Sequence, residues 1–341
     1  MRLTRLLATG VAMALALSAA PFSVSPARAE VNEVRISKGF GVHYLPMYVI
    51  QHEKLVEKHA AAAGLGHVTV QWPTIDGGNV INDAMLAGAL DIASLGVPGF
   101  LTLWAKAKGN PRLEVVGLSA ISLGSMYLNT RNPRINSLRD FTEADKIAMP
   151  GIKTSYAAVV LQMMVAKEFG EQNYDKLDPL TVGLPYPEAV TALLSGKTEI
   201  DAHVASPPFS FMELDNKNIH RVFNSADVFG PTLVIMAHTT RAFYEKNPKL
   251  SAAFIAAATE ATQLIAKDKR AAARMYNDLA TVRSSEDEIL RILNDPDTRF
   301  TTTPDGFMLF ADFMYRVGTI KQKPAAWTDA FVPELASLPG H

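Results

Sequence analysis

Two segments rich in glycine and hydroxyl side chains have the residue types best suited to holding a small polar molecule. Gly77 and Gly78 allow a backbone to approach a ligand closely, and Thr154 and Ser155 are typical helix N-caps. The free N–H groups at a helix start favour an anion, and Lys153 would add a positive charge. A tight turn and an ordinary helix cap would explain the same residues without a ligand. The segment around the two glycines lacks the lysine of a phosphate-binding P-loop.

Aromatic and imidazole side chains form a second group of candidate ligand contacts. Tyr44, Tyr156 and Tyr186 fall in predicted loops, and we expect at least one of them to contact the ligand, although packing between lobes would also account for them. His43 and His203 occupy similar loops, one in each half of the chain. A metal site at these histidines would need carboxylates at a matching spacing, and the sequence does not supply them. The pattern therefore favours a metal-free binding site.

Catalytic motifs are missing from the sequence. It contains no cysteine, which excludes disulfides, thiolate nucleophiles and Cys-ligated zinc, and it has no G-x-S-x-G motif. His52 and His59 share one predicted helix with many charged residues, so we expect them on a solvated face. We predict a binding protein rather than an enzyme, without a cofactor.

Short apolar runs alternate along the chain with segments of helical period, which is typical of an α/β fold with mainly parallel sheets flanked by helices. The pattern predicts strands at 34–37, 68–72, 92–95, 113–118, 126–129, 146–149, 180–184, 200–204 and 234–237. One helix is expected over 46–62, and only helices are expected after Thr240. Because the units form two series, we predict two lobes, with lobe 1 at 30–125 and 230–341 and lobe 2 at 126–229.

Ligands of open α/β sheets bind beyond the carboxyl ends of the strands. The candidate cleft loops are therefore 39–44, 76–79, 94–99 and 119–124 in lobe 1, and 150–156, 184–188 and 203–209 in lobe 2.

Residues 1–29 have the features of a cleaved secretory signal peptide. Two arginines precede an apolar run (6–20) that is too short for a stable membrane anchor, and Ala27 and Ala29 are the small residues of a cleavage site. We expect a freely diffusing periplasmic protein that begins near Glu30. The formal net charge is −1, so charge gives no reason to bind nucleic acid or an anionic membrane.

Three stretches resemble the solute-binding proteins of ABC importers of the nitrate, sulfonate and taurine group. They are VRISKGFGVHYLPMYVIQHEKLVEKHA (34–60), DGGNVINDAMLAGALDIASLGVPGFLTLWAKAKGN (76–110) and TALLSGKTEIDAHVASPPF (191–209). The passage from Ala84 to Pro98 carries the most specific part of this resemblance. The resemblance implies the type II periplasmic binding fold, in which two α/β lobes joined by two crossing strands close over one small molecule.

The resemblance also implies ligand-contacting positions and partners. By loop position, the implied ligand-contacting residues are Gly41, His43, Tyr44, Gly77, Gly78, Asn79, Ser94 and Gly96 in lobe 1, and Lys153, Thr154, Ser155, Tyr186 and His203 in lobe 2. The implied partners are an inner-membrane permease and its ATPase subunits, and the implied state is a monomer. The implied solute is a small anion such as a sulfonate, taurine or nitrate.

The loop GFGVHY (39–44) departs from the glutamine-containing loop common in sulfonate binders. Aromatic carboxylates and thiamine-related pyrimidines are therefore alternative solutes. A pyrimidine-synthase-like enzyme is a further alternative, but such enzymes have a cysteine-rich motif and this chain has no cysteine.

Overall fold

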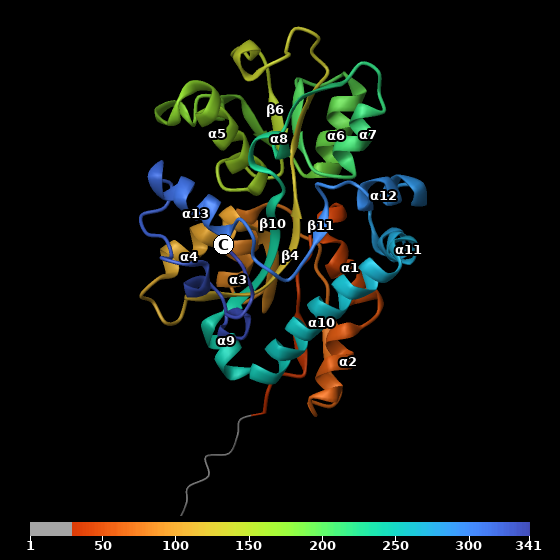
Figure 1. The fold of residues 1–341 in the computed structure, drawn as a ribbon, viewed down its shortest axis with the longest axis vertical. Helices are drawn as coiled ribbons and strands as arrows, with labels where there is room; N and C mark the ends of the chain where they lie inside the picture. The colour runs from red at the N-terminus through yellow and green to blue at the C-terminus, as the bar shows by residue number, and fades with distance from the viewer. Residues whose placement is uncertain (1–28) are drawn as a thin grey trace, which may run out of the picture.

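The computed structural model describes residues 29–341, so the predicted signal peptide lies outside the described residues except for Ala29. The chain forms two lobes, each built around its own sheet, and Figure 1 shows lobe 2 above lobe 1. The predicted α/β fold class with two lobes is confirmed. Among residues 29–341, no helix is long and apolar enough to cross a membrane.

The sheet of lobe 1 is mixed. It has β11-β4-β10-β3 as one hydrogen-bonded series, and the parallel pair β1-β2 adjoins β3 through a bridge between Ile36 and Ile92. Strand β10 is antiparallel to both of its neighbours, and β11 is antiparallel to β4. The strands are β1 (Glu33–Arg35), β2 (Thr69–Gln71), β3 (Ile92–Gly96), β4 (Val115–Gly124), β10 (Thr232–Thr240) and β11 (Arg299–Phe300).

The sheet of lobe 2 has the order β7-β6-β8-β5-β9 and is parallel except for β5. Its strands are β5 (Tyr127–Thr130), β6 (Ile147–Met149), β7 (Thr181–Gly183), β8 (Ala202–Ala205) and β9 (His220–Asn224). The helices of this lobe are α5 (Tyr156–Phe169), α6 (Tyr186–Ser195), α7 (Phe209–Leu214) and α8 (Ala226–Phe229), with the 3₁₀ turns η2 (Leu138–Asp140), η3 (Glu171–Asn173) and η4 (Asp178–Leu180).

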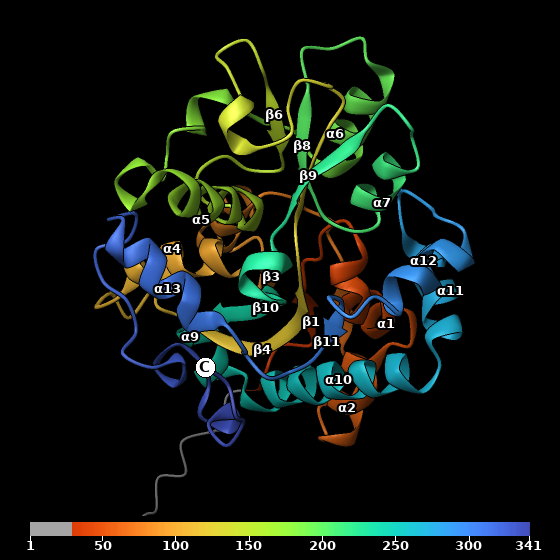
Figure 2. The ribbon, with the colours of Figure 1, turned by 45° about the horizontal axis from the view of Figure 1, so that its top comes forward.

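The chain passes between the sheets twice, from β4 to β5 and from β9 to β10. The two passages are tied together, because Met126 N donates to Ser225 Oγ at 2.9 Å and Ser225 N donates to Met126 O at 2.9 Å. Figure 2 shows β4 and β10 side by side below this point. The division of the chain at 126 and 230 stays a prediction, and we propose these paired passages as the hinge.

Helices cover both faces of the lobe 1 sheet. They are α1 (Leu45–His52), α2 (Leu55–Ala62), α3 (Gly78–Leu86), α4 (Val97–Ala107), α9 (Arg241–Lys246), α10 (Pro248–Lys267), α11 (Lys269–Leu279), α12 (Glu286–Leu293) and α13 (Phe307–Arg316). Three 3₁₀ turns, η1 (Val42–Tyr44), η5 (Trp327–Ala330) and η6 (Pro333–Leu335), complete the lobe.

Three expectations about lobe 1 were wrong. The helix predicted over 46–62 is broken, because Lys54 adopts a left-handed conformation (φ 51°) and separates the nearly fully buried α1 from α2, which buries only one face. His52 and His59 therefore lie on different helices, and each contacts a carboxylate, His52 that of Glu53 and His59 that of Glu260.

Residues 119–124 form the buried end of β4 instead of a loop, because β10 pairs with β4 along most of its length. The region after Thr240 is also not purely helical, since β11 adds an edge strand to β4.

The segment 280–341 contacts both lobes. The ring of Phe310 lies 5.1 Å from that of Tyr156 at the start of α5, and Arg316 Nε lies 3.2 Å from the carboxylate of Glu171. On another side of the molecule, Asn224 Nδ2 donates to Asp297 Oδ2 at 2.9 Å. The C-terminal segment, which was assigned to lobe 1, therefore also packs against lobe 2.

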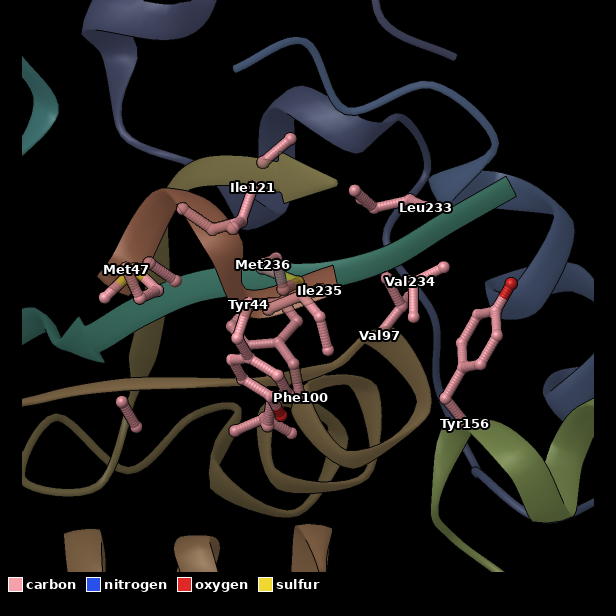
Figure 3. Close-up of a cluster of buried hydrophobic side chains, with 14 of the residues drawn as sticks. Tyr44, Met47, Val97, Phe100, Ile121, Tyr156, Leu233, Val234, Ile235 and Met236 are labelled. Carbon is pink, nitrogen blue, oxygen red and sulfur yellow. The ribbon is translucent and has the colours of Figure 1, made fainter. Parts of the chain in front are cut away.

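The main core follows β10, where Leu233 to Met236 are buried among residues of β4, α4 and η1 (Figure 3). One polar ring is enclosed in the same strand. His238 is fully buried beside Phe100, at 5.2 Å between ring centroids, and neither of its ring nitrogens has a hydrogen-bond partner among the described residues. Burial lowers the pKa of His238 from 6.5 to about 3. The unfolded chain therefore binds a proton near pH 6.5 that the folded chain does not.

We expect the variant His238→Leu to weaken the acid sensitivity of the fold. In the wild type, the contribution of His238 is complete above pH 6.5 and is lost as pH falls toward 3, by about 2 kcal/mol at pH 5. The leucine variant should change stability at pH 7.5 by less than about 1.5 kcal/mol and lose less on acidification. Urea unfolding at pH 7.5 and pH 5 measures both effects. The variant His67→Gln, which replaces an exposed histidine, is the control. Equal acid losses in the wild type and His238→Leu would contradict this assignment.

Candidate functional site

A cavity lies between the two lobes. Lobe 1 contributes the segments that follow β1, β2 and β3, and part of β10. Lobe 2 contributes the segments that follow β6, β7 and β8. The lining residues are Phe40, His43, Tyr44, Asp76, Gly77, Gly78, Ile81, Leu95, Gly96, Gly99, Met126, Pro150, Thr154, Ser155, Tyr156, Ala157, Tyr186, Ser206, Val234 and Ile235. The cavity thus lies where the carboxyl ends of strands from both sheets meet, which is the usual place for a ligand in α/β folds.

Most of the residues expected at a ligand site line this cavity. The structure brings together His43, Tyr44, Gly77, Gly78, Gly96, Thr154, Ser155 and Tyr186. Gly77 shows why a glycine is needed here, since its φ is 89° and an added Cβ would lie 3.0 Å from Pro150 O of the other lobe. That these residues contact a ligand remains a prediction.

Five other expected residues lie outside the lining. Gly41 adjoins Pro207 of lobe 2, and Ser94 Oγ donates to Ser37 O at 2.5 Å inside lobe 1. Asn79 and Lys153 are exposed, and His203 is fully buried behind the wall of the cavity. Lys153, which was expected to add a positive charge, therefore does not line the cavity.

The start of α5 was predicted as a capped anion site. Ser155 is confirmed as the N-cap, because its Oγ accepts from Ala158 N at 3.1 Å and donates to Gly151 O at 2.5 Å. Thr154 precedes the cap, and its Oγ1 donates to Asn79 Oδ1 of lobe 1 at 2.8 Å. Both hydroxyl groups thus already have protein partners.

Asp76 is an ionisable residue that lines the cavity but was not among the predicted ligand-contacting residues. Its Oδ1 accepts from Gly77 N at 3.0 Å, and its Oδ2 accepts from Tyr186 N at 3.4 Å across the cleft. Burial raises the pKa of Asp76 from 3.8 to about 6. Its position beyond the carboxyl end of β2, directly before two glycines, was the signal that could have identified it.

His43 has a buried imidazole that faces the cavity, and its exposed fraction is 2%. Neither ring nitrogen has a hydrogen-bond partner in the part of the chain that the structure describes. Burial lowers the pKa of His43 to about 4. The nearby backbone of Ser125 partly offsets this decrease, but it forms no hydrogen bond with either ring nitrogen. The ring is therefore neutral at physiological pH and offers one donor and one acceptor.

Aromatic rings make up much of the cavity wall. Tyr186 stacks on Phe209 at 5.5 Å between ring centroids, and Tyr156 extends from α5 alongside Val234, as Figure 3 shows. Burial raises the pKa values of Tyr44, Tyr156 and Tyr186, and the nearby carboxylate of Asp76 raises those of Tyr44 and Tyr186 further. All three phenols are therefore neutral donors at neutral pH.

A buried polar network supports this wall from behind. His203 Nδ1 lies 2.5 Å from Glu213 Oε1, and Asn129 Nδ2 donates to Glu213 Oε2 at 2.8 Å, with all three side chains fully buried. The ring of Tyr186 lies 5.5 Å from that of His203. The network links β5, β8 and α7 to the aromatic wall.

Several contacts join the lobes around the cavity. Val42 N donates to Pro207 O at 2.9 Å, and Tyr156 Oη lies 2.5 Å from Thr232 Oγ1. With the Thr154–Asn79 hydrogen bond, they define a closed arrangement of the two lobes.

The two lobes, two crossings and enclosed interlobe cavity define the class of periplasmic binding folds, and comparisons with solved structures agree. The alkanesulfonate-binding protein SsuA of Xanthomonas axonopodis, bound to MOPS, matches with a TM-score of 0.68 and 16% identity over 86% of this chain and 96% of that chain. The nitrate-binding protein NrtA of Synechocystis matches with a TM-score of 0.67 and 14% identity over 88% and 84%. A Candida albicans protein described as having the generic periplasmic binding fold matches with a TM-score of 0.66 and 14% identity over 90% and 96%.

The profile of the NMT1-like family matches residues 27–279, and the chain belongs to this family. No curated protein matches the sequence. The predicted kinship with the nitrate, sulfonate and taurine group of binding proteins is confirmed by this family and by the shared fold.

Proposed function

We propose that this protein is the solute-binding component of an ABC import system. The observation that carries the proposal is the enclosed interlobe cavity, into which lobe 1 presents the buried and unpartnered imidazole of His43. A buried polar group without a partner is rare in folded proteins, and a ligand that hydrogen-bonds to it would supply the missing interaction. We therefore propose that the site binds a solute and does not convert it.

The mechanism is capture by hinge closure. Solute contacts with both lobes stabilise the closed form, because the open form can offer only half of these contacts. The closed shape then presents both lobes to the membrane permease, whose ATPase subunits drive transport. In this proposal the chain acts in the periplasm as a monomer after removal of residues 1–29.

The family resemblance implies two solute classes. One comprises sulfonates, taurine and nitrate, as in the structural relatives named for sulfonate and nitrate. The other comprises aromatic carboxylates and thiamine-related pyrimidines. The classes differ in charge and in aromatic surface, so one screen can distinguish them.

We expect a solute of the correct class to raise the melting temperature without being converted. At a hundredfold excess over its Kd, a solute that binds only the folded chain adds about 2.7 kcal/mol to stability. A thermal-shift screen of the purified mature chain against both classes, followed by mass spectrometry of the recovered solute, measures both points. Conversion of the solute would favour an enzyme, and no stabilisation by any compound would argue against solute binding.

A further inference from the structure

The charges around the cavity are opposite to what an anionic solute needs. None of the lining residues within 29–341 is lysine or arginine, and Asp76 is the acidic residue among them. Lys153, the cation expected to serve an anion, is exposed and outside the lining. His43 is neutral at physiological pH because burial lowers its pKa to about 4. A carboxylate thus determines the charge of the site.

Asp76 also has unused capacity to accept hydrogen bonds. A carboxylate can accept about four, and the protein supplies two from backbone N–H groups, one of them at 3.4 Å. Asp76 is not a member of any ion pair among the described residues. Enclosure of such a group between closed lobes is unfavourable unless a proton or a donating ligand compensates it.

The surrounding rings favour the same kind of ligand. Phe40, Tyr44, Tyr156 and Tyr186 line the cavity together with Asp76. The faces of aromatic rings attract cations, so rings beside a carboxylate are typical of sites for positively charged nitrogen.

We propose that Asp76 makes this cavity selective for a solute with a positively charged or hydrogen-bond-donating nitrogen, an inference that rests on the proposed solute-binding function. The nitrogen donates to Asp76, and His43 provides a second, uncharged contact. A zwitterion satisfies this requirement because the start of α5, which includes the lining residue Ala157, can hold its negative end. Nitrate and simple sulfonates do not satisfy it.

Two matched series of probes test the inference. Benzamidine, benzamide and benzoate have nearly the same shape and carry a cation, no charge and an anion, respectively, and an amidine can donate two parallel hydrogen bonds to a carboxylate. Taurine carries an amine at the position where isethionate carries a hydroxyl group. Calorimetric titration should show benzamidine binding at least about tenfold more tightly than benzoate, and taurine more tightly than isethionate.

The variant Asp76→Asn retains the shape of the side chain and removes its charge. We expect this variant to lower the affinity for benzamidine by about ten- to a hundredfold and to leave the affinity for benzamide nearly unchanged. Asp83→Asn is the matched control, because Asp83 lies on the exposed face of the adjoining helix α3 and outside the lining. Circular dichroism checks that both variants fold.

Benzamidine binding by the wild type should also weaken as pH falls below about 6, where Asp76 takes up a proton. The titratable groups around Asp76 are Tyr44, Tyr48, Tyr186 and His203. The tyrosines stay neutral over this range because burial raises their pKa values. Loss of this pH dependence in Asp76→Asn would assign it to Asp76.

Several results would overturn the inference. One is benzoate or isethionate binding as tightly as its nitrogen-bearing counterpart. Another is an equal loss of all ligands in Asp76→Asn, which would assign Asp76 to lobe closure through Tyr186 N. If none of these probes binds but a simple sulfonate or nitrate does, the inference fails and solute binding stands. If no compound of either screen binds, the proposed function itself fails.

Discussion

Replacing Glu213 by alanine should lower the free energy of unfolding by about 3–5 kcal/mol. Glu213 is fully buried and accepts hydrogen bonds from His203 and Asn129, which are also fully buried. Without the carboxylate, His203 Nδ1 and Asn129 Nδ2 lose this acceptor in a site that water does not reach. Urea unfolding followed by circular dichroism at pH 7.5 measures the loss.

Two further variants show whether the lost interaction is responsible. Glu213→Gln keeps an oxygen acceptor and should lose less stability than Glu213→Ala. Glu188→Ala removes an exposed carboxylate from the neighbouring helix α6 and should change stability by no more than about 0.5 kcal/mol. A Glu213→Ala variant as stable as Glu188→Ala would show that the buried network does not stabilise the fold.

Adding one methyl group at Gly96 should oppose closure of the lobes. Its backbone has an ordinary φ of −66°, so alanine introduces no local strain. The added Cβ would however lie 2.7 Å from Tyr156 Cβ and 3.3 Å from Tyr156 N, which belong to the other lobe. Because overpacking of this kind costs about 1–3 kcal/mol, we expect benzamidine affinity to fall by about five- to a hundredfold in Gly96→Ala.

Small-angle X-ray scattering provides a test of Gly96→Ala that does not depend on the solute. The radius of gyration should increase relative to the wild type as the population shifts toward the open form. Gly183→Ala is the control, since an added Cβ there meets no atom within 4 Å. An unchanged radius of gyration together with unchanged affinity would mean that the lobes close without the contact between Gly96 and Tyr156.

The hydrophobic periodicity of the sequence was sufficient to predict the strands and helices that alternate regularly along the chain. Strands such as β3, β6 and β8 are continuous buried runs followed by helices, and their positions follow from hydrophobic periodicity. The break at Lys54 did not follow from the sequence, because buried apolar residues continue on both sides of it and only the left-handed conformation of Lys54 separates the two helices. Strand β11 is only two residues long, and its pairing with β4 depends on tertiary contacts that no local pattern encodes.

The candidate site could be predicted by loop position more readily than by chemical role. His43, Gly77 and Tyr186 were found because the loops after parallel strands converge at one edge of a sheet. The roles of Thr154 and Ser155 were harder to predict, since their hydroxyl groups bind protein atoms that are visible only in the closed arrangement. Asp76 was overlooked because a carboxylate before two glycines is also an ordinary turn, and only its enclosure between the lobes distinguishes it.

The place of β10 in the sheet has a consequence for how the molecule acquires its structure. This strand lies between β3 and β4, although it follows all of lobe 2 in the sequence. Lobe 1 therefore cannot complete its sheet until Thr240 is available to pair with Val115, and β11 joins later still. Contacts between residues so distant in sequence slow folding. A nascent chain that has not yet reached β10 remains without a finished core, which would keep the chain unfolded during the export that we propose.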